Sequence, residues 1–407
     1  MRTEEVITPV FYVRGLNPPY NEGYIQIVNN IIRALATQNL TSVVFNYKYP
    51  IHGFKNPRVH CRQRYDQSIP IIDREMVVHG RKRSIAAYSS LIETIATPKF
   101  MSIERVLKSN GSRLIVNMVN CFRYPRVMAK ALSKTPIVLH FYMSKTSNGP
   151  LVQTILDKAD KIITSSQTVA TNIQRIHNVE TKKLAVLYPP IDVDFYKPLD
   201  KSQARRNLGI SKEDQILLYV GKVVKDRFPE KIVLPALQDL IKENPKVKLL
   251  VFAPETRENL RRVAEIEANT RSLNLSGCLK IIVKNLSASE KSVLYGASDL
   301  FLYPSINPDT ATEPPLTILE AMASGLPVIS SDMPSVREII SDGNNGAVVS
   351  FLDDTGKRLS DKIVNYFRSA EAVIKMSFEA RRSIEERMSL SVSGRQLIKV
   401  YEETFHR

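Results

Sequence analysis

The stretch YPSINPDTATEPPLTILEAMASGLPVISSDMPSVRE, residues 303–338, decides the fold because it contains a complete strand–loop–helix–strand unit. The apolar run 300–303 predicts the end of a buried parallel strand. A polar loop follows as far as Glu313, and residues 327–330 predict the next buried strand. The helix between them therefore begins at the carboxyl end of a parallel strand.

Two prolines open this helix. Pro314 and Pro315 fit a first helical turn, because proline lacks an N–H group and that turn leaves its N–H groups without intrahelical acceptors. The helix is expected to end at Gly325, which tolerates the left-handed backbone of a helix C-terminus. The first amides, at Leu316 and Thr317, face the crevice above the sheet and predict a phosphate-binding site.

Two carboxylates flank the start of the helix. Glu313 precedes a proline, which pushes it towards an extended conformation in the loop, and Glu320 lies on the second helical turn. Such a pair suits a ligand with hydroxyl groups near a diphosphate, since one acid can accept from sugar hydroxyls and the other from ribose hydroxyls. The alternative is a surface helix with two ordinary glutamates.

The segment 313–332, EPPLTILEAMASGLPVISSD, resembles the signature of the retaining GT-B glycosyltransferases of family 4 (glycosyl transferases group 1), which use nucleotide sugars. In that family two glutamates are separated by seven residues. The first contacts the transferred sugar and the second contacts the ribose. Here Glu313 and Glu320 are separated by six residues, and strict alignment places Thr312 at the first position. The resemblance implies that Glu313 orients the sugar and Glu320 binds the ribose.

A second motif follows the strand predicted for residues 215–221. Lys222 and Arg227 match the two basic residues with which the family holds the donor diphosphate, with the residue types exchanged. Charge builds on the diphosphate as the glycosidic bond breaks, and two cations with a helix N-terminus can stabilise it without a metal. The alternative for Lys222 is a solvent-exposed lysine.

The first half of the chain carries weaker signals. Gly23 lies in a loop that resembles the glycine loop after the first strand of the family, although no GxGxxG fingerprint is present. His140 ends the strand predicted for residues 136–142, where the resemblance implies a histidine near the transferred sugar. Tyr142 falls at the usual histidine position and shares a strand face with His140. The alternative for His140 is a structural core histidine.

The chain is strongly basic, with a net charge of +16. Residues 1–195 hold 26 Lys and Arg against 13 Asp and Glu, whereas the remainder holds 31 against 28. The basic first half includes the segment 48–90, which is expected to be irregular. This charge predicts an anionic partner such as a membrane face, a phosphate-bearing acceptor lipid or nucleic acid. A solubility bias of the source organism is the alternative, and no aromatic-rich basic motif supports nucleic acid.

Other features of the composition bear on the cellular location and the source of the protein. The three cysteines show no CxxC pair, and no run is apolar enough to span a bilayer, so we expect a cytoplasmic protein, with peripheral membrane association left open. The absence of Trp and the many Lys, Arg and Ile residues point towards a thermophile. Asp192 and Asp194 form an Asp-x-Asp in a linker and are not interpreted as a metal site.

We therefore expect an α/β protein of the GT-B type, with two Rossmann-like doubly wound domains facing a central cleft. The predicted domains are 1–195 for the acceptor, 196–375 for the nucleotide sugar, and a helical segment 376–407 that crosses back to the first domain. The predicted activity is retaining transfer of a hexose from a nucleotide-diphosphate sugar to a glycan, lipid-linked or other hydroxyl acceptor, without a metal or cofactor. The alternative is a non-catalytic module that binds a nucleotide sugar.

Overall fold

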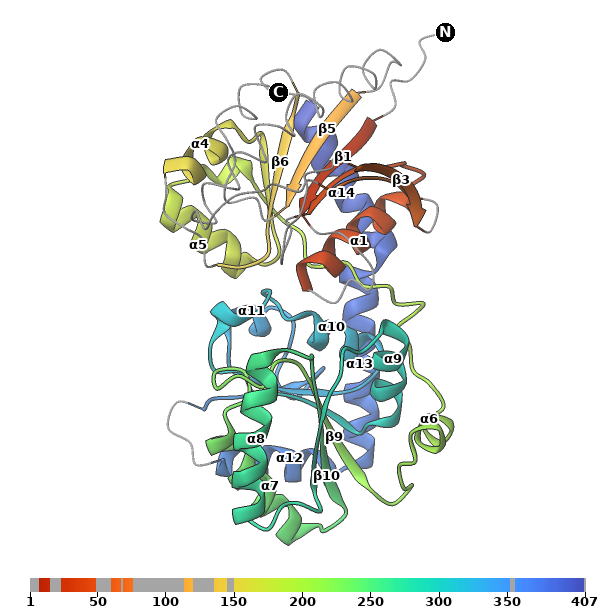
Figure 1. Cartoon of the computed structure of the whole chain (residues 1–407), viewed down its shortest axis with the longest axis vertical. Coiled ribbons are helices and arrows are strands. Elements are labelled where there is room, and N and C mark those ends of the chain that lie inside the picture. The colour runs from red at the N-terminus through yellow and green to blue at the C-terminus, as the bar shows by residue number, and fades with distance from the viewer. Residues whose placement is uncertain are drawn as a thin grey trace. The chain divides into compact units, whose positions relative to one another are not determined.

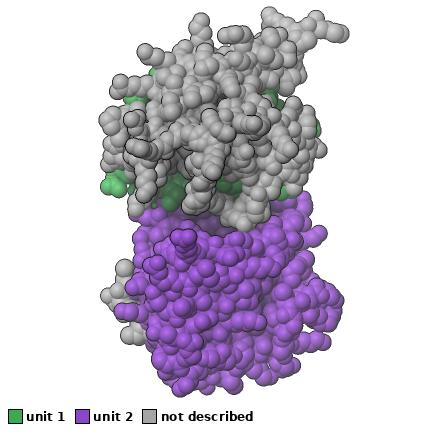
Figure 2. Space-filling view, in the orientation of Figure 1, with its two compact units in different colours: residues 1–190, 390–407 green, residues 191–389 purple. Residues whose placement is uncertain are grey.

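The computed structural model describes residues 7–14, 23–48, 60–66, 69–75, 113–119, 135–144, 150–351 and 356–405. The chain divides into two compact units (Figure 2). The first contains residues 1–190 and 390–407, and the second contains residues 191–389. The boundaries predicted from the sequence, after residues 195 and 375, differ from these, since the compact units change after residues 190 and 389.

The first unit is built on a sheet whose order among the described strands is β3-β4-β2-β1-β5-β6-β7-β8 (Figure 1). All neighbouring strands are parallel except β3 and β4. Its elements are β1 (Ile7–Arg14), α1 (Gly23–Ala36), β2 (Val43–Lys48), β3 (His60–Asp66), β4 (Ile69–Glu75), β5 (Arg113–Val119), β6 (Ile137–Phe141), α4 (Pro150–Lys158), β7 (Lys161–Thr164), α5 (Gln167–His177), the 3₁₀ turn Thr181–Lys183, β8 (Leu184–Val186) and α14 (Leu390–Phe405).

The prediction of an irregular segment 48–90 was wrong for the part that the structure describes. Strand β4 pairs in parallel with β2, and β3 pairs antiparallel with β4 at the edge of the sheet. The charged residues of β3 hid this strand from a search for apolar runs, although charges on an edge strand are common because they discourage pairing with other chains. The rest of the segment lies outside the described residues, so its role in binding an acceptor or a membrane stays a prediction.

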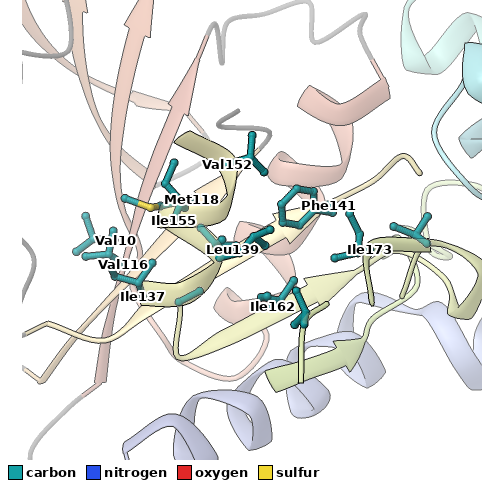
Figure 3. Packing of buried hydrophobic residues seen from close by; sticks show 14 of the residues in the cluster. Val10, Val116, Met118, Ile137, Leu139, Phe141, Val152, Ile155, Ile162 and Ile173 are labelled. Atoms are coloured by element: carbon teal, nitrogen blue, oxygen red, sulfur yellow. The ribbon is translucent and has the colours of Figure 1, made fainter. Parts of the chain in front are cut away.

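The core of the first unit lies between the central strands and the helices that cover them. Val116 and Met118 from β5, Leu139 from β6 and Ile162 from β7 are buried together with Ile173 from α5 (Figure 3). Strands buried on both faces need continuous apolar runs, which explains the sequences RLIVNMV and IVLHF.

The second unit is built on a parallel sheet with the order β11-β10-β9-β12-β13-β14. Its elements are α6 (Lys201–Leu208), β9 (Gln215–Val220), α7 (Glu230–Glu243), β10 (Val247–Ala253), α8 (Arg257–Ser272), β11 (Leu279–Val283), α9 (Ala288–Ala297), β12 (Leu300–Tyr303), the 3₁₀ turn Pro308–Thr310, α10 (Leu316–Ala323), β13 (Val328–Ser331), α11 (Pro334–Arg337), β14 (Ala347–Val349), α12 (Lys357–Phe367) and α13 (Ala370–Met388).

Helices cover both faces of this second sheet. Right-handed crossovers place α7 and α8 on one face and α9 and α10 on the other. Helix α12 contacts α7, and α13 contacts α10 (Figure 1). The strand–loop–helix–strand unit predicted from the sequence is observed as β12, α10 and β13. The predicted glycine end of the helix is also confirmed, because Gly325 has a φ of 69° and its N–H bonds to the carbonyl oxygen of Met322.

The last helix of the described chain returns to the first unit. Helix α14 packs along α1, and their backbones approach closely at Gly394 (Figure 1). A Cβ atom at this position would collide with the carbonyl oxygen of Ala34 and lie 2.8 Å from Cγ of Gln38. The absence of a side chain at residue 394 is therefore a condition for this helix pair.

We expect Gly394→Ala to lower the free energy of unfolding by about 1–3 kcal/mol, because the added methyl group forces α14 away from α1. Chemical denaturation followed by circular dichroism measures the change. Gly277→Ala is the matched control, since a Cβ atom there meets no atom within 4 Å. Equal stabilities of the two variants would contradict the close approach at Gly394.

Candidate functional site

The strand order of the second sheet reverses at one place, which is where a ligand-binding crevice is expected in an open parallel sheet. The chain runs from β9 outward to β10 and β11, returns to β12 beside β9, and then continues in the opposite direction to β13 and β14. Strands β9 and β12 are parallel neighbours, with Leu217 opposite Leu300. In open parallel sheets, ligands bind outside the carboxyl ends of the strands beside the point where the strand order reverses. Lys222 follows β9, and the loop 304–315 follows β12.

Hydrogen bonds join these two loops at the carboxyl edge of the sheet. The carbonyl oxygen of Asp226 accepts from the Ile306 N–H at 2.8 Å and from the Ser305 hydroxyl at 3.2 Å. The Asp226 carboxylate accepts from Nδ2 of Asn307 at 2.9 Å. The two loops therefore form one structural unit, which brings together segments about 80 residues apart in the sequence.

Arg227 is fixed within this unit. Its guanidinium group donates from Nε to the Thr310 hydroxyl at 3.3 Å and from a second nitrogen to the Thr310 carbonyl oxygen. Burial raises the pKa of Tyr219 and of Tyr303, and the positive charge of Arg227 acts in the opposite direction on both phenols. Arg227 is thus half-buried among the ends of β9 and β12, with its charge held close to both strands.

Lys222 differs from Arg227 in its surroundings. Its side chain is exposed, and among the described residues only its backbone is bound, through the carbonyl oxygen. A compact ammonium on a flexible stem is suited to meet an anion that enters from solvent. The two predicted cations therefore lie in the same loop, one held by protein groups and one open to a ligand.

Helix α10 begins at the same edge. Its N-cap, Pro315, provides no side-chain hydrogen bond. The amides of Leu316 and Thr317 lie in the first turn, where a helix leaves its N–H groups without intrahelical acceptors. Leu316 is buried and Thr317 is half-buried. This helix start adds a partial positive charge to an edge of the sheet that carries Lys222 and Arg227, together with the carboxylates of Asp226 and Glu313.

Glu313 lies in the loop directly before α10, as predicted, and it precedes a cis peptide bond to Pro314. The residue is only 2% exposed. The carboxylate is therefore largely shielded from solvent, and its predicted contact with a sugar stays a prediction.

Glu320 lies one turn further into α10 and belongs to a buried polar cluster. Oε1 accepts from Nζ of Lys291 at 2.6 Å and from the Tyr196 hydroxyl at 3.1 Å. Oε2 accepts from Nζ of Lys291 at 2.8 Å and from the Tyr295 hydroxyl at 2.8 Å. The lysine and glutamate side chains are 7% and 4% exposed. Since a carboxylate offers about four acceptor positions, a ribose hydroxyl would have to replace one of these partners.

Side chains of α13 bind the backbone at the C-terminal end of α10. Arg381 from α13 donates to the carbonyl oxygens of Ala323 at 2.6 Å and of Tyr196 at 3.1 Å, and Ser377 donates to the carbonyl oxygen of Gly325. A guanidinium group at this end also complements the helix dipole. Helix α10 is therefore anchored from behind, so that its start keeps a fixed position at the crevice.

His140 and Gly23 belong to the first unit. Gly23 is the first residue of α1, and the loop before it lies outside the described residues. His140 is 1% exposed, and its Nε2 lies 2.9 Å from Oδ1 of Asn117. Asn117 Oδ1 also accepts from the Tyr401 hydroxyl at 2.8 Å. Since an amide oxygen only accepts, Nε2 of His140 carries the proton.

The other ring nitrogen of His140 is also occupied. Nδ1 lies 3.3 Å from the Tyr142 hydroxyl, which therefore donates to it. Burial lowers the pKa of His140 to about 3. A neutral imidazole with both nitrogens bonded within the core of its own unit has the features of the structural alternative considered for this residue. These bonds do not test a contact with substrate, so the catalytic role stays a prediction.

The Asp-x-Asp of the linker forms a local turn. Asp192 accepts from the Phe195 N–H at 3.1 Å through Oδ1 and is buried. Across the part of the chain that the structure describes, no group of three His, Cys, Asp or Glu side chains is arranged to hold a metal ion. In the same part of the chain, no helix combines the length and the apolar character needed to cross a membrane.

Sequence reasoning missed the partners of Glu320. Lys291, Leu294 and Tyr295 share one face of α9 at helical spacing, and all three are buried. A lysine on an otherwise apolar helix face signals a buried partner of opposite charge, because an unpaired ammonium is rarely buried. That signal predicts a partner but does not identify Glu320.

The fold defines a class of protein, an α/β protein of the GT-B type. Solved structures show the same fold over almost the whole chain. A glycosyltransferase from Rickettsia africae ESF-5 has a TM-score of 0.74 and 16% identity, covering 98% of this chain and 99% of that chain. Anabaena Alr3699/HepE in complex with UDP and glucose has a TM-score of 0.71 and 15% identity, covering 97% and 99%. The predicted GT-B fold is confirmed.

The second unit is similar to a known family. Residues 200–382 match the model of the family Glycosyl transferases group 1, the group whose signature the sequence of this region resembles. D-inositol 3-phosphate glycosyltransferase 2 of Catenulispora acidiphila is 24% identical over 203 residues, which are 49% of this chain and 46% of the relative. The chain matches about half the length of such curated relatives.

Acid should destabilise the protein through His140. The neutral ring is retained in the folded state down to about pH 3, whereas the unfolded chain binds a proton below about pH 6.5. The contribution of His140 to the free energy of unfolding is therefore complete above pH 6.5. It is lost by about 1.4 kcal/mol per pH unit as the pH falls towards 3. Urea unfolding between pH 7 and 5 measures the dependence of the free energy of unfolding on pH. This dependence should be weaker for His140→Gln than for the unmodified protein, and equal dependences would contradict this assignment.

Lys291→Met should lower the free energy of unfolding by about 3–5 kcal/mol, because it leaves the Glu320 carboxylate buried without its cation. The denaturant midpoint of the second unit measures the loss. Lys284→Met is the matched control, since it breaks an exposed ion pair with Glu290 beside the same helix and should cost below about 1 kcal/mol. Combining Lys291→Met with Glu320→Gln should recover part of the stability. A Lys291→Met protein as stable as the control would show that the cluster is not an ion pair.

Proposed function

We propose that this chain is a retaining glycosyltransferase of family 4 that transfers a hexose from a nucleoside-diphosphate sugar to a hydroxyl group of a glycan, lipid-linked or other acceptor. The observation that supports this most directly is the place of two cations and a helix start in the second sheet. Lys222 and Arg227 follow β9, and α10 follows β12, the strand beside it at the reversal of strand order. The match to Glycosyl transferases group 1 covers the same unit.

In this proposal the diphosphate of the donor lies across the start of α10. The amides of Leu316 and Thr317 donate to phosphate oxygens, Lys222 neutralises one phosphate from the solvent side, and Arg227 provides a fixed charge at the base of the loops. As the bond between the sugar C1 and the phosphate oxygen breaks, negative charge grows on the leaving nucleoside diphosphate. Preorganised cations and amides stabilise that charge, which removes the need for a metal ion.

The transfer proposed here keeps the anomeric configuration. The acceptor oxygen forms a bond to C1 on the face that the diphosphate leaves, and the acceptor proton passes to the departing phosphate oxygen. No side-chain nucleophile takes part, so no covalent sugar–enzyme intermediate forms. This chemistry depends on holding the two substrates together, which is the contribution expected of oriented binding groups.

The two glutamates have distinct places in the proposal. Glu313 precedes α10 and orients the hexose. Glu320 either exchanges one of its four hydrogen bonds for a ribose hydroxyl or supports α10 from behind through Lys291. His140 and Gly23, from the first unit, are proposed to lie near the transferred sugar and the acceptor, with the burial of His140 favouring its structural alternative.

The setting of the reaction is also proposed. A cytoplasmic enzyme whose basic first half meets an anionic membrane surface or a phosphate-bearing lipid acceptor fits the charge of +13 counted over residues 1–195. Anabaena Alr3699/HepE was solved with UDP and glucose, which supports a uridine nucleotide as a first candidate for the donor.

The alternative is a module that binds a nucleotide sugar without transferring the sugar. Two observations favour it. Glu313 and Glu320 are separated by six residues rather than the seven of the family signature. The carboxylate of Glu320 is already saturated by Lys291, Tyr295 and Tyr196. Tight binding of a nucleotide sugar with no product, across a panel of acceptors, would support this alternative.

We expect one nucleotide sugar from a panel to stabilise the purified protein without magnesium. Thermal unfolding identifies this donor, since a ligand at about 100 times its Kd adds about 2.7 kcal/mol to the free energy of unfolding.

We expect Lys222→Ala to lower the transfer rate about 100-fold, because a charge that stabilises the leaving group is lost. Product formation measures the rate.

Lys242→Ala is the matched control for this experiment. It removes an exposed lysine from the far end of α7, paired with the exposed Asp239, and should transfer sugar at the normal rate. If no nucleotide sugar or nucleoside diphosphate stabilises the protein, the proposed function is wrong. If Lys222→Ala keeps full activity, the assignment of Lys222 to the diphosphate is wrong.

A further inference from the structure

Side chains bind both polar groups of one peptide in the loop that carries Lys222. The carbonyl oxygen of Lys222 accepts from the Tyr219 hydroxyl at 2.6 Å. The N–H on the other side of the same peptide bond, that of Val223, donates to Oδ1 of Asn259 at 3.1 Å. Both polar groups of the Lys222–Val223 peptide are therefore bound by side chains, one from β9 and one from α8. The peptide plane cannot rotate without breaking both hydrogen bonds.

The two side chains that hold this peptide are themselves fixed. Tyr219 and Asn259 are fully buried. Nδ2 of Asn259 donates to the carbonyl oxygen of Pro254 at 2.7 Å, which determines the orientation of the amide and leaves Oδ1 for Val223. The Tyr219 ring packs against Phe228 at the other end of the loop, with ring centroids 5.2 Å apart.

A third side chain extends the contact from the peptide to the next helix. Arg262 donates from Nε to the carbonyl oxygen of Val223 at 3.4 Å and from a terminal nitrogen to Oε2 of Glu230 at 2.5 Å. Glu230 is the first residue of α7, directly after the loop. Arg262 therefore joins the beginning of the loop to its end and pairs with a carboxylate that is 12% exposed.

Gly221 makes the Tyr219 contact possible. The tyrosine ring folds back over residue 221 so that its hydroxyl reaches the carbonyl oxygen of Lys222. A Cβ atom at residue 221 would lie 2.8 Å from the hydroxyl oxygen and 3.0 Å from the ring carbon that bears it. Contacts this short do not occur in stable packing. Gly221 therefore leaves the space that the Tyr219 hydroxyl needs to reach the carbonyl oxygen of Lys222.

We propose that Tyr219 and Asn259 are positioning residues of the diphosphate site, which hold the Lys222–Val223 peptide in the one orientation that keeps the Lys222 ammonium at the crevice. This inference rests on the proposed role of Lys222. A lysine side chain has several rotatable bonds, so binding an anion already costs conformational entropy, and a mobile backbone would add to that cost. Fixing the peptide before the ligand arrives removes the added cost.

Tyr219→Phe tests the inference because it removes only the hydroxyl group that donates to the Lys222 carbonyl oxygen. We expect the Kd for UDP and for ADP, measured by calorimetry, to rise about three- to tenfold, the range that one hydrogen bond contributes. Asn259→Ala removes the other contact and should weaken binding by a similar factor. The ring of Tyr219 and its packing on Phe228 are retained in the phenylalanine variant, so the fold should be preserved.

A double-mutant cycle with Lys222→Ala separates positioning from general stability. If Tyr219 acts through Lys222, adding Tyr219→Phe to Lys222→Ala should change the Kd by less than about twofold, because the charge it positions is already gone. Additive losses would overturn the inference, since they would show that Tyr219 affects binding by another route.

Tyr366→Phe is the matched control, because it removes a tyrosine hydroxyl that donates to a carbonyl oxygen, that of Asp299, elsewhere in the same unit. It should bind UDP and ADP like the unmodified protein. Unchanged binding by Tyr219→Phe and Asn259→Ala, with binding lost in Lys222→Ala, would overturn the positioning role and leave the proposed function intact. Failure of the unmodified protein to bind any nucleoside diphosphate would overturn both.

Discussion

The backbone polar groups beyond the end of β9 impose the constraint on which the second unit depends. Within the sheet, neighbouring strands satisfy each N–H and C=O group, but beyond Val220 the chain leaves the sheet while still in contact with its core. Buried backbone groups there need other partners. Asn259 and Arg262 provide them from α8, and Asp226 accepts from the loop after β12. In the loop after β9, side chains therefore bind backbone groups that neighbouring strands would bind within the sheet.

The same requirement explains why α10 is anchored so heavily. A helix start can attract an anion only if its first N–H groups remain without protein acceptors, which leaves that end without stabilising bonds of its own. The compensation lies further along the helix. Glu320 bonds to Lys291 and two tyrosines, and Arg381 donates to the carbonyl oxygen of Ala323, the last residue of the helix. The contacts of Glu320 and Arg381 thus hold α10 in place while the N–H groups at its start stay available to a ligand.

Local patterns predicted much of this unit. Gly325 marks the end of α10 as predicted, whereas both prolines precede its first residue, Leu316, instead of forming its first turn. The cations at residues 222 and 227 stand out because they closely follow an apolar strand. Pairings between distant residues could not be predicted in the same way. Lys291 and Glu320 are 29 residues apart, and Asn117 and Tyr401 are 284 apart, so no periodicity within one element relates them. Strand β3 was missed because an edge strand can carry charged residues throughout.

The path of the chain has a consequence for its biosynthesis. Residues 1–190 leave the ribosome first, yet the helix that packs along α1 and reaches Asn117 through Tyr401 comes after residue 389. The second unit is continuous in sequence, so it has all its parts while the first still lacks α14. At a synthesis rate of about 5–20 residues per second, this interval lasts roughly 10–40 s. During that time Asn117 and the surface of α1 around Ala34 lack their final partners, so the first unit completes its fold after the second.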